Sequence, residues 1–260
     1  MRLPVAAALL SAVVVLAGAA SAPGAGAQEL SVFGGLGTWV DIYDGAVYAA
    51  PERTAQRISA RGVRTVWVET ANFRASADVV NRAALGRFVE ALHARGVGAV
   101  AWYLPGHVNP ALDVRRALAM LSFRTASGQP FDAVALDIES TKLRNVGLRS
   151  RRAVALAQRL KQEAGETPVA IVPFNPRGLE RRPATWPRYV TRALRLLRAH
   201  TGNPDVPIHV AGGVADRLGT EELAGFVAAV EDDGGTIGVS LYDWATTPAR
   251  AWPVLASATD

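Results

Sequence analysis

Four acidic residues stand at or near the ends of short runs of β-branched and aliphatic residues. They are Asp41, Glu69, Asp137 and Glu139. Two neighbouring carboxyl groups can divide acid and base work between them, because one can hold a proton while the other stays ionised. Whether these four can act together depends on whether their runs are adjacent strands that end at the same place.

From Leu36 onward the chain repeats one unit. A short β-branched run is followed by polar or aromatic residues, then by an amphipathic helix rich in Ala, Arg and Leu, then by Gly. Strand, loop and helix in this order predict parallel strands joined by crossover helices. We expect strands at Thr38–Tyr43, Arg64–Thr70, Gly98–Leu104, Ala133–Ser140, Val169–Asn175, Ile208–Gly212 and Gly238–Trp244.

These units number seven, and the stretch between Pro176 and Pro207 holds one good helix without a convincing strand. The pattern predicts a single α/β domain at residues 36–260, a (β/α)8-like TIM barrel with a degenerate or missing sixth strand, after a linker at residues 28–35. A doubly wound open sheet is the alternative, because it uses the same local units. The absence of Gly-x-Gly-x-x-Gly after the first strand argues against that alternative.

Side chains alternate along a strand, so large aliphatic residues at every second position indicate the side that packs on helices. Val134 and Leu136 would face the helices, which turns Asp137 and Glu139 into the barrel. The same argument places Asp41 and Glu69 inside. It also places four aromatic residues inside, namely Tyr43, Tyr103, Tyr242 and Trp244.

Two further residues depend on the same parity argument. Asn175 points inward only if Ala170, Val172 and Phe174 pack on helices. Asp243 is a weaker candidate, because strict alternation turns it outward. The carboxyl ends of the strands are where barrels of this type build their active sites.

A cluster of buried carboxylates needs a reason, because burial of unpaired charge is costly. Some of these groups could pair with Arg or cap helices, and for a single acidic residue that is the better interpretation. Four of the same parity, flanked by aromatic side chains, favour a functional pocket.

Residues 1–27 have the pattern of an export signal. Arg2 precedes an apolar run that ends at Leu16, and Ala25-Gly26-Ala27 fits a cleavage site before Gln28. An uncleaved membrane anchor is the alternative, but small residues follow the run without a basic stop. We therefore expect a secreted, monomeric protein that is not held at a membrane after cleavage.

Charge and composition exclude several classes of protein. The net charge is +5, and the arginines spread along the expected helices instead of clustering as in a nucleic-acid binder. A weak attraction to an anionic cell-wall polymer stays open. The chain has no cysteine, so disulfides and thiolate zinc sites are excluded.

The sequence predicts neither a cofactor nor a metal centre. His93 and His200 fall on expected helices, His107 falls in a loop, and His209 points inward but deep, as a core histidine would. An all-carboxylate site for a divalent cation stays open.

The segment from Phe131 to Glu139 resembles the Asp-x-Glu fourth strand of chitinase-like enzymes and of secreted muramidases. Asp41 matches the first-strand Asp of the muramidases. More broadly, the segments around Trp39, at residues 206–213 and at residues 238–244 resemble uncharacterised secreted glycoside hydrolase-like barrels of actinobacteria. The resemblance spans most of the chain after residue 27.

This resemblance implies a glycoside hydrolase that acts on a polysaccharide or a cell-wall glycan. Glu139 would be the acid and Asp137 would orient a substrate group, while Asp41 or Glu69 would be nucleophile, base or charge stabiliser. Sugar rings would contact Tyr43, Tyr103, Asn175, Tyr242 and Trp244. The alternative is a carbohydrate-binding barrel that kept the fold without turnover.

The export signal generates the first prediction. We expect the exported protein to begin at Gln28, because signal peptidase cleaves after a small-x-small sequence. N-terminal sequencing of protein recovered from the medium measures this directly. Exported protein that begins at Met1 would contradict the prediction.

Overall fold

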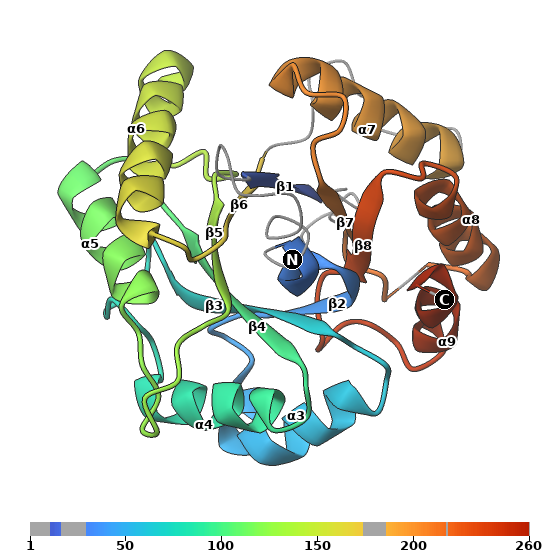
Figure 1. Ribbon diagram of the computed structural model, residues 1–260, viewed down its shortest axis with the longest axis horizontal. Coiled ribbons are helices and arrows are strands. Elements are labelled where there is room, and N and C mark those ends of the chain that lie inside the picture. The colour runs from blue at the N-terminus through green and yellow to red at the C-terminus, as the bar shows by residue number, and fades with distance from the viewer. Residues whose placement is uncertain (1–10, 17–29, 174–185, 217, 260) are drawn as a thin grey trace, which may run out of the picture.

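The computed structural model describes residues 11–16, 30–173, 186–216 and 218–259 of the chain. Eight strands form a closed barrel in the order β1-β6-β5-β4-β3-β2-β8-β7, and helices surround it (Figure 1). From β2 to β8 every paired neighbour runs parallel. The predicted barrel fold is therefore confirmed.

The parallel strands begin close to where the sequence places them, but several end earlier. Asp41, Glu139 and Trp244, expected within strands, lie in the loops that follow them. The bounds of the seven strands are Gly35–Val40 for β2, Thr65–Asn72 for β3, Gly98–Leu104 for β4, Ala133–Asp137 for β5, Val169–Val172 for β6, Ile208–Gly212 for β7 and Thr236–Leu241 for β8.

The remaining strand, β1, comes from the expected export signal. Its residues, Ser11–Leu16, lie between β6 and β7 and run antiparallel to both. This is the place where the sequence predicted a missing strand. Its backbone pairs with two sheet edges that would otherwise have free N–H and C=O groups. Removal of the segment as an export signal stays a prediction.

Helices follow the strands along the chain and cover the outside of the barrel (Figure 1). Their ends follow local signals. Pro110 occupies the first turn of one helix, and the Asn109 side chain before it accepts a hydrogen bond from Leu112 N–H. The bounds are Gly45–Ala49 for α2, Pro51–Ser59 for α3, Arg82–His93 for α4, Pro110–Leu121 for α5, Val146–Ala164 for α6, Trp186–Thr201 for α7, Thr220–Glu231 for α8 and Ala251–Ala256 for α9, with short 3-10 helices at Ser31–Phe33 (η1) and Ser257–Thr259 (η2). Among the described residues, no helix is long and apolar enough to cross a membrane.

Two cores stabilise the barrel. The outer core lies between strands and helices and includes Leu36, Val68 and Leu136. The inner core fills the barrel with Trp39, Trp67 and Trp102 from three adjacent strands, opposite small residues of β5 and β6. Large side chains on one side and alanines on the other let one layer fill the interior.

The parity prediction is correct for β2, β3 and β5 but wrong for β4. Val100 and Trp102 belong to the inner core, while Ala99, Ala101 and Tyr103 face the helices. The rule that large side chains mark the helix-facing side fails on β4. Its helix-facing positions are mostly alanines, and its largest side chain, Trp102, fills the barrel. Tyr103 therefore points away from the barrel interior, contrary to the prediction.

The position of β1 generates the second prediction. A chain that begins at Gln28 should keep the seven parallel strands, because these pair with one another in an unbroken series from β6 through β2 to β7. The amides of β6 and β7 should exchange with solvent about tenfold faster than in the full chain, because their edges lose a pairing partner.

Hydrogen exchange of the two chains, followed by mass spectrometry, measures this difference. The amides of β3 and β4 are the internal control. Unchanged exchange in β6 and β7 would show that β1 does not pair there.

Candidate functional site

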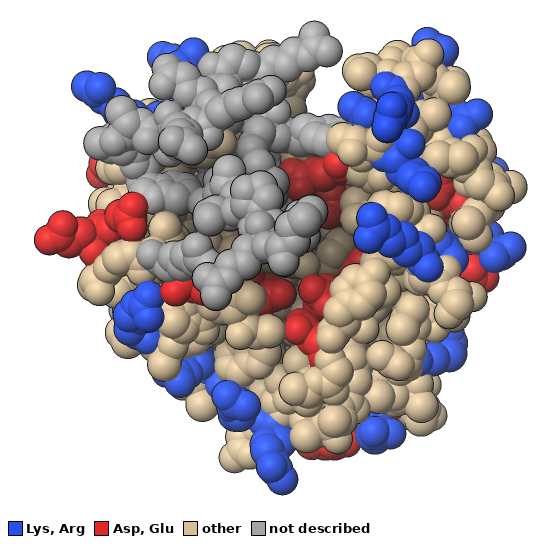
Figure 2. All heavy atoms as spheres, turned by 180° about the vertical axis from the view of Figure 1, so that it is seen from behind, with Lys and Arg blue, Asp and Glu red and all other residues tan. Residues whose placement is uncertain are grey.

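Six carboxylates meet at the carboxyl ends of the strands, and we call them the acidic cluster. They come from the ends of β3 and β5 and from the loops that follow β2, β5 and β8. Figure 2, seen from the side opposite to Figure 1, shows acidic side chains near the middle of this face and basic ones mostly around its edge. The members are Asp41, Asp44, Glu69, Asp137, Glu139 and Asp243.

One corner of the cluster is formed by Asp41, Asp44 and Asp243, whose nearest oxygens lie within 4.8 Å of one another. Asp41 accepts hydrogen bonds from Tyr43 N–H at 2.6 Å and from the Tyr242 hydroxyl at 3.0 Å. Asp44 accepts one from Asp41 N–H at 3.1 Å. Burial, and then the charges of Asp41 and Asp243, raise the pKa of Asp44 to about 6 against a backbone hydrogen bond that lowers it. Carboxylates in this arrangement are the type of ligand that a hard divalent cation prefers.

Glu69 lies at the centre of the cluster and is only 2% exposed. Its Oε2 accepts a hydrogen bond from Ile42 N–H at 3.0 Å. Burial, and then the charges of Asp41 and Asp137, raise its pKa to about 7, against hydrogen bonds from Ile42 and Asn72 that lower it. Near neutral pH this carboxyl group is therefore present in both protonation states.

Asp137 and Glu139 point to the same side, because Ile138 between them packs against the outer core. The Glu139 N–H donates a hydrogen bond to Asp137 Oδ1 at 3.0 Å. Burial first, and then the charge of Glu139, raise the pKa of Asp137. Two like charges this close disfavour each other, so the pair keeps a proton to a higher pH than a free carboxyl group does.

The aromatic residues of the sequence prediction separate into two groups. Tyr242 lies beside Asp41, as expected, and its ring is 6.3 Å from that of Trp39. Tyr43 is 68% exposed, and its hydroxyl accepts a hydrogen bond from Asn72. Trp244 packs against Trp252 on the outer side of the barrel, because β8 ends at Leu241 and alternation stops there.

Asn175 lies outside the described residues. The inward position of Asn175 required Ala170 and Val172 to pack on helices. Both residues belong to the inner core instead. Strict alternation would turn Asp243 outward. Because β8 ends at Leu241, alternation does not reach Asp243, and its carboxylate lies in the acidic cluster.

Sequence reasoning missed Asn72, Asp44 and Tyr48. The pairing of β3 with β4 shifts by one residue between Glu69 and Ala71, which reverses the parity of Asn72. Asp44 lies in a turn, where alternation gives no information. The Tyr48 hydroxyl is buried without a hydrogen-bond partner among the described residues, and burial and then the charges of Glu69, Asp44 and Asp41 raise its pKa.

Tyr103 contributes to the site by holding loops in place. Its hydroxyl donates a hydrogen bond to Asp113 Oδ1 at 2.6 Å, and Asp113 also accepts the backbone N–H of His107 at 2.9 Å. The buried guanidinium of Arg116 donates to the carbonyl oxygens of Asn72 and Ala75. These bonds fix the segments that follow β3 and β4.

Beneath the cluster, hydrogen bonds join some polar atoms of the barrel interior, while Trp67 Nε1 and Trp102 Nε1 have no hydrogen-bond partner among the described residues. Trp39 Nε1 donates to Ser240 Oγ at 2.9 Å, and His209 contacts the same hydroxyl at 2.9 Å and Phe33 O at 2.7 Å. Burial lowers the pKa of His209 to about 4, against the bond to Phe33, which raises it. The prediction that His209 is a core histidine is confirmed.

Comparisons with solved structures show the same fold. A GH113 β-1,4-mannanase superposes with a TM-score of 0.58 at 12% identity, over 88% of this chain and 98% of that chain. GH5_18 from Bifidobacterium longum subsp. longum gives a TM-score of 0.59 at 12% identity, over 87% of this chain and 74% of that chain. Both are glycoside hydrolases with a (β/α)8 fold, so the chain has the fold of that class.

No protein-family model matches the chain, and no curated protein matches it. The resemblance to muramidases and to actinobacterial proteins therefore stays a prediction, while the barrel fold is shown.

The environment of Glu69 generates the third prediction. Its pKa rises from an ordinary value of 4.5 to about 7 on folding, so the folded protein holds a proton that the unfolded chain releases between these values. The free energy of unfolding should therefore fall as pH rises from 4.5 to 7, by about 3 kcal/mol from this group. Glu69→Gln should remove this part of the pH dependence, because Gln keeps an acceptor for Ile42 N–H and carries no charge.

Urea unfolding of both proteins between pH 4.5 and 8 measures the difference. Glu231→Gln, at an exposed position at the end of α8, is the matched control. If the free energy of unfolding changes equally with pH in wild type and Glu69→Gln, Glu69 is not the group with the raised pKa.

Proposed function

We propose that this protein is a secreted glycoside hydrolase that acts on a polysaccharide or a cell-wall glycan at the acidic cluster. The observation that carries the proposal is the group of carboxyls with raised pKa, Asp44, Glu69 and Asp137, among further carboxylates at the carboxyl end of a TIM barrel. The fold shared with a mannanase and a GH5 enzyme supports the same class.

Hydrolysis of a glycosidic bond needs an acid that protonates the leaving oxygen. In this proposal the Asp137–Glu139 pair holds that proton, and Glu139 delivers it, because Glu139 lies further toward the mouth of the barrel. The raised pKa of Asp137 supports a shared proton near neutral pH. Asp137 then orients Glu139 through its hydrogen bond with the Glu139 backbone.

The second role is to attack, or to activate water against, the positively charged sugar carbon. Asp41 and Glu69 are the candidates. Asp41 is held in one orientation by Tyr43 N–H and the Tyr242 hydroxyl, which suits a group that must meet a carbon from a fixed direction. A separation of about 5–5.5 Å from the acid would give retention, and one of about 6.5–9.5 Å inversion.

Sugar contacts in this proposal come from side chains at the rim of the cluster. Tyr43 offers an exposed ring, and Tyr242 lies beside Asp41. Asn72, which donates to the Tyr43 hydroxyl, fixes this ring in place. Tyr103, which the sequence predicted as a sugar contact, is left out of this proposal, because its side chain faces the helices and its hydroxyl is bound to Asp113.

The fourth prediction tests the acid. Glu139→Gln should lower the release of reducing sugar by about 100-fold or more, since it removes general acid catalysis. Wild type and variant are assayed on peptidoglycan, chitin, mannan and α- and β-linked glucans. Glu166→Gln, at an exposed position after α6, is the control and should keep full activity.

Equal release by wild type and Glu139→Gln would remove Glu139 as the acid. Binding of a glycan by both without release by either would identify the non-catalytic carbohydrate-binding barrel instead.

A further inference from the structure

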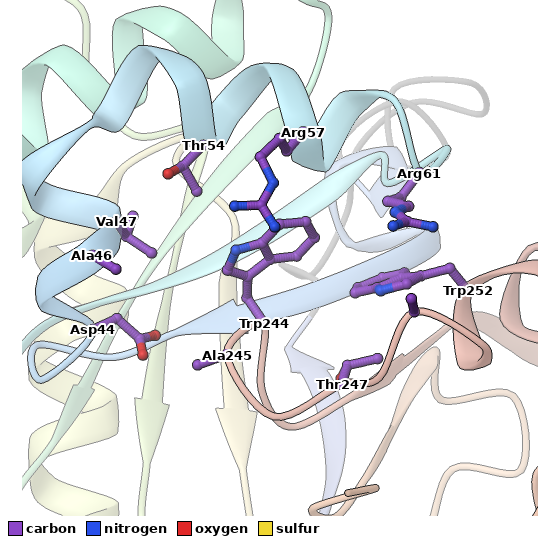
Figure 3. Close-up of a pocket in the computed structure, with 11 residues that line it drawn as sticks. Asp44, Ala46, Val47, Thr54, Arg57, Arg61, Trp244, Ala245, Thr247 and Trp252 are labelled. Atoms are coloured by element: carbon purple, nitrogen blue, oxygen red, sulfur yellow. The ribbon is translucent and has the colours of Figure 1, made fainter.

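A separate pocket opens beside the acidic cluster, between α2, α3 and the segment from β8 to α9 (Figure 3). Its volume is about 360 Å³, within the range of roughly 300–1,000 Å³ typical of small-molecule sites. Its lining residues include Asp44, Arg57, Arg61, Trp244 and Trp252.

Two indole rings form the apolar part of the pocket. Trp244 and Trp252 have ring centroids 5.3 Å apart and planes inclined at 48°. Trp252 is buried and fixed in the outer core, and Trp244 is partly exposed. Two inclined flat rings offer apolar surface against which the C–H face of a sugar ring can be buried.

Two guanidinium groups form the polar part. Arg57 lies over the Trp244 ring, with Cζ 5.7 Å from its centroid, and Figure 3 shows Arg61 beside the Trp252 ring. Among the described residues neither has an ion-pair partner, while Glu52 of the same helix is bound to Arg87 at 3.3 Å. A guanidinium that stacks on an aromatic ring keeps its N–H groups for a planar anion.

The pocket is joined to the cluster through Asp44. This side chain lines the pocket, and its carboxylate lies within 4.8 Å of those of Asp41 and Asp243. A ligand in the pocket is therefore next to a ligand at the cluster. An anionic substituent would be repelled at the Asp44 end and attracted at the Arg end, which orients a ring inside the pocket.

We propose that this pocket binds a sugar unit that carries an anionic group, with its ring against Trp244 and Trp252 and its charge on Arg57 and Arg61. This inference rests on the proposed function, because only a glycoside hydrolase would make the bound sugar unit a part of its substrate. The substrate class is then an acidic glycan, with a carboxylate or a phosphate on the unit next to the cleaved one. A neutral glycan would leave both exposed guanidinium groups to water and could use only the indole rings.

Binding of paired ligands to the Glu139→Gln protein, by titration calorimetry, provides the fifth prediction. The ligands are glucuronate and galacturonate trisaccharides and a muramic-acid tetrasaccharide, each with its methyl ester, together with glucose 6-phosphate and glucose. At least one anionic member should bind about tenfold or more tightly than its neutral partner, which is what a charge-assisted hydrogen bond provides. The pair that shows the preference identifies carboxylate or phosphate as the group bound.

Arg57→Gln and Arg61→Gln should each reduce this preference by about threefold, and the double variant should abolish it. Arg53→Gln removes an equal charge from an exposed position of the same helix and should keep the preference. Equal affinity for anionic and neutral members in every pair would overturn the inference. An equal loss in Arg53→Gln and the pocket variants would also overturn it, because it would show attraction to the net positive charge alone.

Together with the hydrolysis assay of the wild-type protein, this binding experiment separates the two proposals. A preference for anionic ligands without hydrolysis of any glycan supports the pocket and refutes the proposed enzyme. Hydrolysis of a neutral glycan with no anionic preference supports the enzyme and refutes the pocket.

Discussion

The aromatic stack that fills the barrel is the constraint on which the site depends. Trp39 and Trp67 lie 4.9 Å apart with planes inclined at 12°, and Phe33 stacks on Trp67 at 5.6 Å. These rings form an apolar floor beneath the carboxylates, in which Ser240 Oγ is hydrogen-bonded to Trp39 Nε1 and contacts His209. Carboxylates above such a floor lose solvation on one side, which is the first cause of the raised pKa values of Glu69 and Asp137.

The close approach of several carboxylates has a second consequence. Glu69 is influenced by the charges of Asp41 and Asp137, and Asp137 by that of Glu139, so protonation of one group favours ionisation of another. A set of this kind can hold protons near neutral pH and pass them between neighbouring groups. The neighbouring pocket has the opposite character, because Arg57 and Arg61 face it. A chain-like ligand that spans both would meet protonated acids at one unit and cations at the next.

The segment that closes the barrel lies in the apolar run that the sequence predicts to be an export signal. The run at residues 11–16 has the composition of an export signal and also the pairing properties of a strand, since β1 is bonded to β6 on one side and β7 on the other. Short apolar runs do not distinguish these uses by themselves. The six carboxylates of the acidic cluster come from the parallel strands and from the loops that follow them.

The sequence by itself determined the repeating strand–helix unit, the barrel and the inward position of Glu69 and Asp137, because alternation holds within a strand and aliphatic residues identify its outer side. Asp41 and Glu139 lie one and two residues beyond their strands, and both still belong to the cluster. Tertiary structure decided the positions of Tyr103, Asn72 and Trp244. On β4 the largest side chain, Trp102, fills the barrel interior, so Tyr103 faces the helices. On β3 a one-residue shift against β4 reverses the parity of Asn72. Beyond Leu241 the strand has ended, and only the packing of α3 and α9 sends Trp244 to the outer pocket while Asp243 joins the acids, which no local pattern contains.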